Sequence, residues 1–216
     1  MEERLVLLFT GGEPVDPGIE LLLPAADLVI AADSGLAAAV ALGRRVDLVI
    51  GDLDSAAPAM VAAAEAAGAT VERHPTAKAE TDLELGLVAA LQRGATHVVV
   101  VGGYGGRLDH FLANALLLAS PRFASTRIEA YTGAARVTVV RDHAVLHGSV
   151  DDLVSLLAVG GPATGVRTEG LLYELRGEQL DAGSSRGVSN VFTATDAVVS
   201  LESGVLLAVQ PDGGGS

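Results

Sequence analysis

Two carboxylates near residue 50 have a spacing that suits a cation site. Asp52 and Asp54 directly follow the apolar residues 48–50. In an extended segment, residues two apart point to the same side, and two carboxylates on one side repel each other unless a cation lies between them. A small number of hard oxygen ligands favours Mg²⁺, which keeps several waters and shares phosphate oxygens with a ligand. The alternative for Asp54 is a cap on a helix expected at 57–67.

A second polar string contains Lys78, Thr81 and Asp82 and precedes a helix expected at 83–92. Asp82 would add a third carboxylate to the metal site, and Lys78 would meet a phosphate as a point charge. The alternative is structural, because Thr81 or Asp82 would cap the helix and favour its dipole. A lone lysine in a loop is usually only solvated.

The segment 102–107 combines backbone freedom with a guanidinium group. Its glycines are Gly102, Gly103, Gly105 and Gly106, and Arg107 follows them. Such a loop lets the backbone approach a phosphate closely, and the helix expected after it would turn its positive end toward that ligand. Arg107 has a fork that fits phosphate oxygens. The spacing is neither that of a Walker A loop nor that of a dinucleotide-binding fingerprint, and the alternative is a mobile loop with a solvated arginine.

Asp33, Asp109 and His110 are the other polar groups near these loops. Asp33 directly follows the apolar residues 28–32, and Asp109-His110 lies at the start of a helix expected at 109–118. Asp109 would cap that helix. His110 is either a general base or a residue with a capping or packing role.

These side chains need a scaffold that brings several strand ends together, and the first 131 residues have the pattern of one. Apolar runs typical of buried parallel strands alternate with segments of helical spacing. The expected strands are 5–9, 28–32, 48–50, 69–73, 98–101 and 128–131, and the expected helices are 35–42, 57–67, 83–92 and 109–118. The pattern predicts an α/β domain with a mostly parallel sheet covered on both faces. Such sheets bind ligands at the carboxyl ends of their strands, where these polar groups lie.

The pattern changes near Gly133, after which no amphipathic helix is expected. Short β-rich runs separated by Gly and Pro predict an all-β sandwich or small barrel. The runs are 136–140, 153–157, 171–175, 197–201 and 205–209. The expected domains are an α/β domain at 1–133 and a β-sandwich at 134–212, followed by a flexible tail at 213–216.

Ser189, Asn190 and Phe192 are the residues of the second half that suit ligand binding. Ser189-Asn190 forms either a turn or a pair that offers a hydroxyl and an amide to a heteroaromatic ligand. Phe192 is either a ring that stacks on this ligand or part of the sandwich core. Tyr173 is expected in the core.

Composition and charge exclude several classes of protein. The 216 residues include 14 Lys and Arg against 27 Asp and Glu, a formal net charge of −13, so a nonspecific nucleic-acid binder is not expected. The absence of cysteine excludes disulfides, thiolate metal sites and cysteine nucleophiles. The first residues are acidic rather than basic, and no apolar run is long enough to cross a membrane. A cytoplasmic protein without a membrane partner is therefore expected.

Six segments occur in the order and at the spacing typical of the thiamine pyrophosphokinase family, which the chain resembles from Leu5 to about Gln210. The segments are 32–35, 51–55, 78–82, 103–110, 170–175 and 187–190. The chain departs from the family pattern at Ala79, where bacterial members often carry Asp, and at Ser34, where Gly is common.

The resemblance implies a catalytic, ATP-binding and Mg²⁺-binding α/β domain and a β-sandwich that binds thiamine. It also implies a homodimer with the thiamine site formed between the two subunits. The implied reaction moves the diphosphate of ATP to the hydroxyethyl oxygen of thiamine, which gives thiamine diphosphate and AMP. Such a transfer depends on positioning and charge neutralisation more than on covalent chemistry.

The site residues that the resemblance implies fall into three groups. Asp52, Asp54 and Asp82 would hold Mg²⁺; Asp33, Lys78, Gly103, Gly105, Gly106 and Arg107 would contact ATP; Thr81, Ser189, Asn190 and Phe192 would contact thiamine. Asp109 and Asp33 are the two candidates for the acid that accepts the proton of the hydroxyl group.

Two other functions stay open. A diphosphokinase for another heterocyclic alcohol, such as a pterin, would use the same acids and glycine loop with a different C-terminal pocket, although the segment 187–190 favours thiamine. A nucleotide-binding sensor without catalysis would not need three strand-end acids together with Arg107, but Ala79 leaves room for it.

Overall fold

The computed structural model describes residues 3–77 and 79–211, so Lys78 and the tail expected at 213–216 lie outside the described residues. The chain forms two compact units, Met1–Leu117 with Ser125–Gly133 and Leu118–Ala124 with Ala134–Ser216. We call them the N-terminal unit and the C-terminal unit. The predicted fold class is confirmed: the first unit is α/β with a parallel sheet, and the second is built from antiparallel strands.

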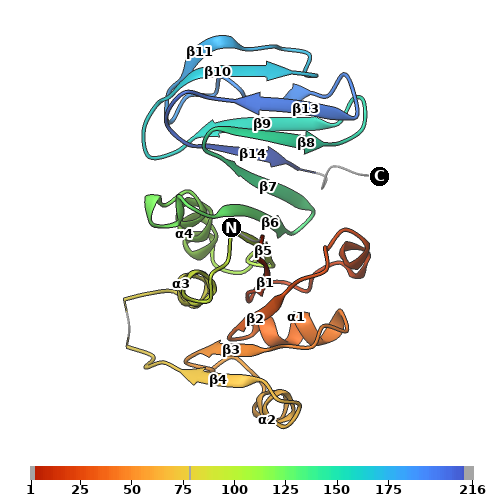
Figure 1. The fold of residues 1–216 in the computed structure, drawn as a ribbon, viewed down its shortest axis with the longest axis vertical. Coiled ribbons are helices and arrows are strands. Elements are labelled where there is room, and N and C mark those ends of the chain that lie inside the picture. Colours follow the sequence, from red (N-terminus) through yellow and green to blue (C-terminus); the bar gives the residue numbers. More distant parts are fainter. Residues whose placement is uncertain (1–2, 78, 212–216) are drawn as a thin grey trace. The chain divides into compact units, whose positions relative to one another are not determined.

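The N-terminal unit is built on parallel strands in the order β6-β5-β1-β2-β3-β4 (Figure 1). The strands are β1 (Leu5–Phe9), β2 (Leu28–Ala32), β3 (Leu48–Gly51), β4 (Thr70–Arg73), β5 (His97–Val101) and β6 (Arg127–Thr132). Their central members are continuous apolar runs, because a parallel sheet is covered on both faces. Each expected strand of this unit is present, within one or two residues of its expected ends.

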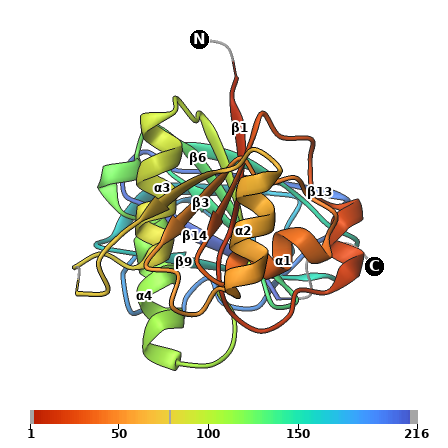
Figure 2. The same cartoon turned by 90° about the horizontal axis from the view of Figure 1, so that it is seen from below.

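Helices cover both faces of this sheet. They are α1 (Gly35–Ala41), α2 (Pro58–Ala66), α3 (Asp82–Gln92) and α4 (Leu108–Leu118), with the short 3₁₀ helix η1 (Pro17–Leu21). A second short 3₁₀ helix, η2 (Pro121–Phe123), belongs to the C-terminal unit. Leu7 of β1 shares a core cluster with Leu36 of α1 and Val61 of α2. Its neighbour Leu8 points the other way, where it lies so close to Gly86 of α3 that a Cβ there would be 2.5 Å away. Figure 2 shows α1 and α3 on opposite sides of the strands.

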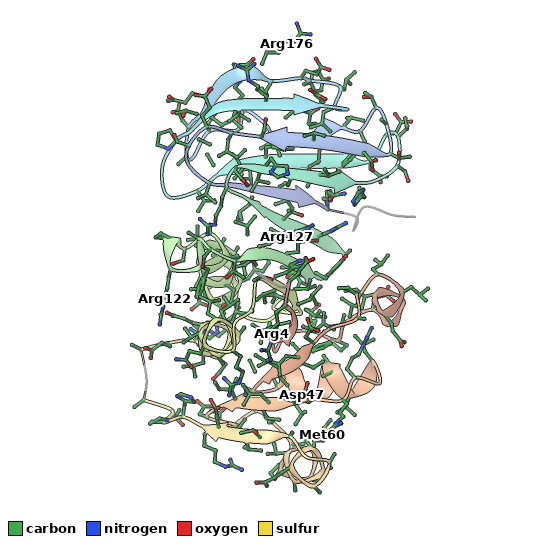
Figure 3. All side chains as sticks on the ribbon, viewed as in Figure 1. Arg4, Asp47, Met60, Arg122, Arg127 and Arg176 are labelled. Carbon is green, nitrogen blue, oxygen red and sulfur yellow. The ribbon has the colours of Figure 1, made fainter. Side chains whose placement is uncertain are left out.

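Acidic residues at the amino ends of these strands have a structural role. Asp27 Oδ2 accepts a hydrogen bond from the N–H of Leu5 (2.8 Å), and Asp47 Oδ2 accepts one from the N–H of Val29 (2.9 Å). Asp47, labelled in Figure 3, directly precedes β3. Each carboxylate thus satisfies one N–H at or next to the start of a neighbouring strand.

The C-terminal unit contains two antiparallel sheets, in the orders β12-β9-β14-β7 and β11-β10-β13-β8 (Figure 1). Their strands are β7 (Ala135–Val140), β8 (His143–His147), β9 (Leu153–Ala158), β10 (Ala163–Glu169), β11 (Arg176–Leu180), β12 (Asn190–Val191), β13 (Asp196–Ser200) and β14 (Leu206–Gln210). Both sheets contribute to one core cluster, which includes Leu156 of β9 and Val199 of β13. This is the packing of a β-sandwich.

One strand prediction for this unit is wrong. The segment 171–175 forms only an isolated bridge between Leu171 and Phe192. Gly170 has a φ of +76°, and a Cβ there would lie 2.4 Å from the carbonyl oxygen of Asp196. The chain therefore turns out of β10 at this glycine instead of continuing as a strand. Within residues 3–77 and 79–211, no helix is long and apolar enough to span a bilayer.

Candidate functional site

The carboxyl ends of the parallel strands surround a cleft of about 780 Å³ in the N-terminal unit. Most of the predicted site residues of this unit line it: Asp33, Asp52, Asp54, Thr81, Asp82, Gly103, Gly105, Arg107 and also His110. Gly106 and Asp109 are sequence neighbours of these residues, but they are not among the described residues that line the cleft. The sheet thus brings together side chains that are up to 77 residues apart in the sequence. This agrees with the rule that parallel sheets bind ligands at the carboxyl ends of their strands.

Three carboxylates form the centre of this cleft. One oxygen of each of Asp33, Asp52 and Asp82 lies within 4.8 Å of the others. Asp33 is only 7% exposed, and its Oδ1 is buried without a hydrogen-bond partner among the described residues. Burial, followed by repulsion from Asp82 and Asp52, raises the pKa of Asp33. An arrangement of three hard oxygen ligands with an unsatisfied buried oxygen fits a divalent cation.

The backbone around the cluster is shaped to bring the acids together. Asp33 and Leu53 adopt left-handed φ values of +47° and +60°, a conformation that leucine rarely adopts. Gly51, with a φ of +139°, leaves space that a Cβ would fill at 2.9 Å from Asp82 Oδ1. The N–H of Asp33 donates to Ile50 (2.9 Å), which fixes the end of β2 against β3. Local strain of this kind is typical of binding sites.

Asp54 lies at the cleft but outside the carboxylate cluster. Its Oδ1 accepts a hydrogen bond from Ser55 Oγ (2.9 Å), and its N–H donates to Asp52 Oδ1 (3.3 Å). The expected metal set was Asp52, Asp54 and Asp82, whereas the structure brings Asp33 to the other two. The reason is the left-handed Leu53, because alternate residues point the same way only in an extended segment. The alternative role as a cap is not observed either, since Ala57 precedes α2 without a side-chain cap.

Thr81 and Asp82 divide their roles at the start of α3. Thr81 is the N-cap, and its Oγ1 accepts a hydrogen bond from the N–H of Glu84 (3.2 Å). The capping interpretation therefore holds for Thr81, although the residue also lines the cleft. Asp82 is the first helical residue, and its carboxylate joins the cluster. The N-terminal dipole of α3 favours a negative charge at this position.

The pair Gly11-Gly12, which was not predicted from the sequence as part of the site, supports the loop after β5. Thr10, Gly11 and Gly12 follow β1 and line the cleft. The N–H of Gly103 donates to Gly11 (2.9 Å), and the N–H of Glu13 donates to Tyr104 (2.7 Å). A Cβ at Gly12 would lie 2.5 Å from the carbonyl oxygen of Tyr104. The signal in the sequence was a Gly-Gly directly after the first apolar run.

Arg107 and Asp109 form a bidentate ion pair at the mouth of the cleft. Arg107 Nε donates to Asp109 Oδ1 (3.1 Å) and Nη2 donates to Oδ2 (2.5 Å). This hydrogen bonding from Arg107 lowers the pKa of Asp109 to about 2. His110 and Asn114 lie four residues apart on α4 and both line the cleft. Asn114 was also missed, although its spacing from His110 places both residues on one helix face.

The predicted ligand residues of the C-terminal unit have roles different from those expected. Phe192 is fully buried in the core cluster, so its ring is not available for stacking, and the alternative interpretation applies. Asn190 is only 3% exposed, and its amide group bonds to backbone atoms of Tyr173. Ser189 is exposed, with a φ of +57°. Tyr173, expected in the core, is 65% exposed.

Comparison with protein families agrees with this geometry. Residues 19–131 match the model described as "Thiamin pyrophosphokinase, catalytic domain", and residues 142–206 match "Thiamin pyrophosphokinase, vitamin B1 binding domain". The chain belongs to the thiamin pyrophosphokinase family. The expected class of enzyme, a thiamine diphosphokinase, is therefore confirmed. The residues that line the cleft from Ala32 onward lie within the part that matches the catalytic domain.

Solved structures of thiamin pyrophosphokinases share the fold. The enzyme from Bacillus subtilis aligns with a TM-score of 0.82 at 22% identity, covering 96% of this chain and 98% of that chain. The protein from Enterococcus faecalis gives 0.78 at 23%, covering 96% and 98%. The yeast enzyme gives 0.75 at 15%, covering 97% and 87%. A comparison with curated protein sequences finds no match. At these identities, the structural likeness concerns the fold alone.

Proposed function

We propose that the chain transfers the diphosphate group of ATP to thiamine. The hydroxyethyl oxygen of thiamine attacks the β-phosphorus of ATP, and the bond from that phosphorus to the oxygen bridging it to the α-phosphorus breaks. The products are thiamine diphosphate and AMP, and the hydroxyl proton passes to a base. The observation that carries this proposal is the carboxylate cluster at the strand ends of a chain that matches both family domains.

Mg²⁺ is the cation that we propose for the cluster. Asp33, Asp52 and Asp82 would hold it, and it would neutralise the charge of the phosphate oxygens. The unpartnered Oδ1 of Asp33 supports this assignment, because a buried carboxylate oxygen without a donor is costly to leave unpaired. Asp54 is two residues from Asp52, lines the same cleft and remains a proposed partner of the cation through its waters.

The glycine-rich side of the cleft, together with Arg107, would hold the ATP phosphates. Gly11, Gly12, Gly103 and Gly105 leave the backbone open to a close approach. Arg107 offers a guanidinium that would exchange its bond with Asp109 for phosphate oxygens. Asp33 would be occupied by the cation, which leaves Asp109 as the proposed acceptor of the hydroxyl proton once Arg107 has moved to the phosphates.

Assembly as a homodimer is part of the proposal. Leu108, Leu112 and Leu116 lie at intervals of four residues on α4, and each is more than half exposed. A stripe of this kind on one helix face indicates an interface. Light scattering should find a dimer, and Leu112→Glu should shift it toward a monomer. A stable wild-type monomer with full activity would contradict this part. A cytoplasmic location stays a prediction.

Product analysis tests the reaction. The chain is incubated with ATP, Mg²⁺ and thiamine, and the products are separated by chromatography. We expect equal amounts of AMP and thiamine diphosphate, and neither product when EDTA is present. ADP with thiamine monophosphate would contradict diphosphate transfer. AMP formed only with a pterin alcohol would favour the other diphosphokinase, and ATP binding without turnover would favour a sensor.

A further inference from the structure

A second hollow of the N-terminal unit lies between α1 and α2, which pack on the same face of the sheet. Its volume is about 220 Å³. Leu36 and Val40 of α1 line it on one side, and Met60 and Ala63 of α2 line it on the other. We call it the α1–α2 groove. None of the described residues that line it also lines the cleft at the strand ends, so the proposed reaction does not use it.

The groove exists because α2 presents small side chains to α1. Met60, Ala63, Ala64 and Ala67 line it at intervals of three and four residues, which place them on one face of the helix. Figure 3 labels Met60 on α2. Three alanines at these positions leave space that larger residues would fill. The helices therefore provide apolar walls with room between them.

Two arginines lie at the end of α1 and also line the groove. Gly43 has a φ of +64°, and the N–H of Arg44 donates to the carbonyl oxygen of Ala39 (2.9 Å), so the chain reverses where α1 ends. Arg44 and Arg45 follow this turn directly. Arg45 Nη2 lies 3.4 Å from where a Cβ of Gly68 would stand, so its guanidinium reaches the end of α2. The turn thus adds two positive charges to an apolar groove.

These two guanidinium groups have no acidic partner in the part of the chain that the structure describes. Arg44 Nε is buried and has no hydrogen-bond acceptor there, and a buried donor without an acceptor is costly. The described lining of the groove contains no acid, although the chain has 27 Asp and Glu against 14 Lys and Arg. Two adjacent like charges also repel each other. An anionic ligand would satisfy the donors and relieve the repulsion.

The shape and charge of the groove suit a small amphipathic anion. A guanidinium fork matches the geometry of a carboxylate, and an aliphatic chain would displace water from the apolar walls. The volume lies below the range of about 300–1,000 Å³ that is typical of sites for drug-sized ligands. A nucleotide is therefore too large for the groove, and a cation such as thiamine has the wrong charge.

We propose that the α1–α2 groove binds a small carboxylate with a short aliphatic chain. The carboxylate lies against Arg44 and Arg45, and the chain lies between Val40 of α1 and Met60 and Ala63 of α2. This site is separate from the carboxylate cluster, and its occupation does not depend on the proposed reaction.

A methionine methyl group reports on the groove directly. The sequence contains two methionines, Met1 and Met60, so labelling their methyl carbons in the full chain gives two NMR signals, and Met60→Leu identifies the signal from the groove. Hexanoate should shift that signal to saturation, with a dissociation constant of about 1 mM. Inorganic phosphate lacks the chain and hexanol lacks the charge, so each should bind about 10-fold more weakly or less tightly still.

The three probes each have an outcome that overturns the proposal. No saturable shift of the Met60 signal with hexanoate would show that the groove takes no such ligand. Phosphate as effective as hexanoate would show a plain anion site, and hexanol as effective would show that the arginines do not contribute. Either result contradicts an amphipathic carboxylate as the ligand.

Arginine substitutions test the charge. Arg44→Gln should weaken hexanoate binding about 10-fold, because it removes a hydrogen-bonded charge. Arg45→Gln should have a smaller effect, because Arg45 is exposed. Arg4→Gln is the matched control, since it removes an exposed arginine of the same unit that does not line the groove. Equal hexanoate affinities of Arg44→Gln and Arg4→Gln would overturn the proposal.

A substitution on α2 tests the shape without changing a charge, which keeps the test decisive if Arg44→Gln does not fold. Ala63 is exposed and leucine is a good helix former, so Ala63→Leu should fold and fill the groove. Hexanoate binding should then be lost. Ala62→Leu is the matched control, because Ala62 is exposed on the same helix and does not line the groove. Wild-type affinity in Ala63→Leu would place the carboxylate elsewhere and overturn the proposal.

Discussion

The cleft at the strand ends of the N-terminal unit and the segment 170–173, which Asn190 holds, use buried polar groups in opposite ways. In the cleft, Asp33 carries a buried oxygen without a partner and is close to two other carboxylates. At the segment 170–173, Asn190 is more buried still, but its amide is fully engaged with the backbone of Tyr173 and Val191. An unsatisfied buried oxygen that lies beside two other carboxylates in a cleft suits a cation, whereas a buried amide that the chain satisfies suits a structural role. Both were expected to touch substrate, and hydrogen bonding separates them.

The largest effect is expected for Phe192→Ala, which tests whether the ring of Phe192 belongs to the core. If the ring is core, its removal should lower the free energy of unfolding by about 3–5 kcal/mol, since Phe192 is fully buried. Denaturant unfolding measures this loss, and Tyr173→Ala provides the exposed control. Below its melting temperature the variant should keep the wild-type KM for thiamine. A stable Phe192→Ala with a raised KM would return the stacking role to Phe192.

Asp52→Asn should remove most of the catalytic activity. Loss of one cation ligand should lower kcat about 100-fold or more, and the fold should remain intact because fewer like charges repel in the cluster. Asp47→Asn is the matched control. Asp47 accepts a backbone hydrogen bond at the amino ends of the strands, away from the cleft, and the amide oxygen of an asparagine can still accept it. Steady-state turnover of both variants, with melting curves, measures the contrast.

Asp33→Asn and Asp54→Asn distinguish the observed cluster from the expected one. If Asp33 is the third ligand, Asp33→Asn should lower kcat far more than Asp54→Asn, because only Asp33 lies within the cluster. The reverse order of the two effects would restore the set Asp52, Asp54 and Asp82.

Mg²⁺ should stabilise the folded chain. At ten times its dissociation constant, the ion should contribute about 1.4 kcal/mol, which raises the melting temperature by roughly 3–6 °C. Asp33→Asn should reduce this shift and should melt slightly higher than the wild type without the ion. A shift of equal size in Asp33→Asn would place the cation elsewhere.

The smallest expected effect concerns the exposed pair at the mouth of the cleft. The pKa of Asp109, about 2, lies below its ordinary value of 3.8, so the pair stabilises the fold above that range and loses this contribution as the pH falls toward 2. The loss should barely move the melting temperature, because both side chains are exposed. A carboxyl NMR titration should give the low pKa, and Arg107→Gln should return it toward its ordinary value.

The positions of the strands were easier to predict from the sequence in the N-terminal unit than in the C-terminal unit. Buried parallel strands such as β1 and β5 are continuous apolar runs, so their positions were clear. In the sandwich, β10 (Ala163–Glu169) and β11 (Arg176–Leu180) are largely polar, and their sequences have no such run. The segment 171–175 looked like a strand because it is apolar, but a left-handed Gly170 decides its course.

The part of the candidate site that lies at the strand ends was predicted from the sequence. Asp52, Asp82 and Arg107 lie in the cleft because the ends of parallel strands meet at one edge. Asp33 replaces Asp54 in the cluster because of the φ of Leu53, which no pattern of residue types specifies. The two-residue strand β12 is too short to have a periodicity, so the burial of Asn190 and Phe192 could not be derived.

The most direct measurement of the central claim is the pair of constants kcat and thiamine KM for two variants in one assay. Asp52→Asn should lower kcat about 100-fold and leave the thiamine KM within about 3-fold. Tyr173→Ala removes the exposed aromatic ring of the C-terminal unit, so it should raise the thiamine KM about 10-fold and leave kcat nearly unchanged. This crossed pattern would assign the chemistry to the cleft and thiamine recognition to the segment 170–173. If both substitutions changed the same constant, or if neither changed either, the division of roles would be refuted.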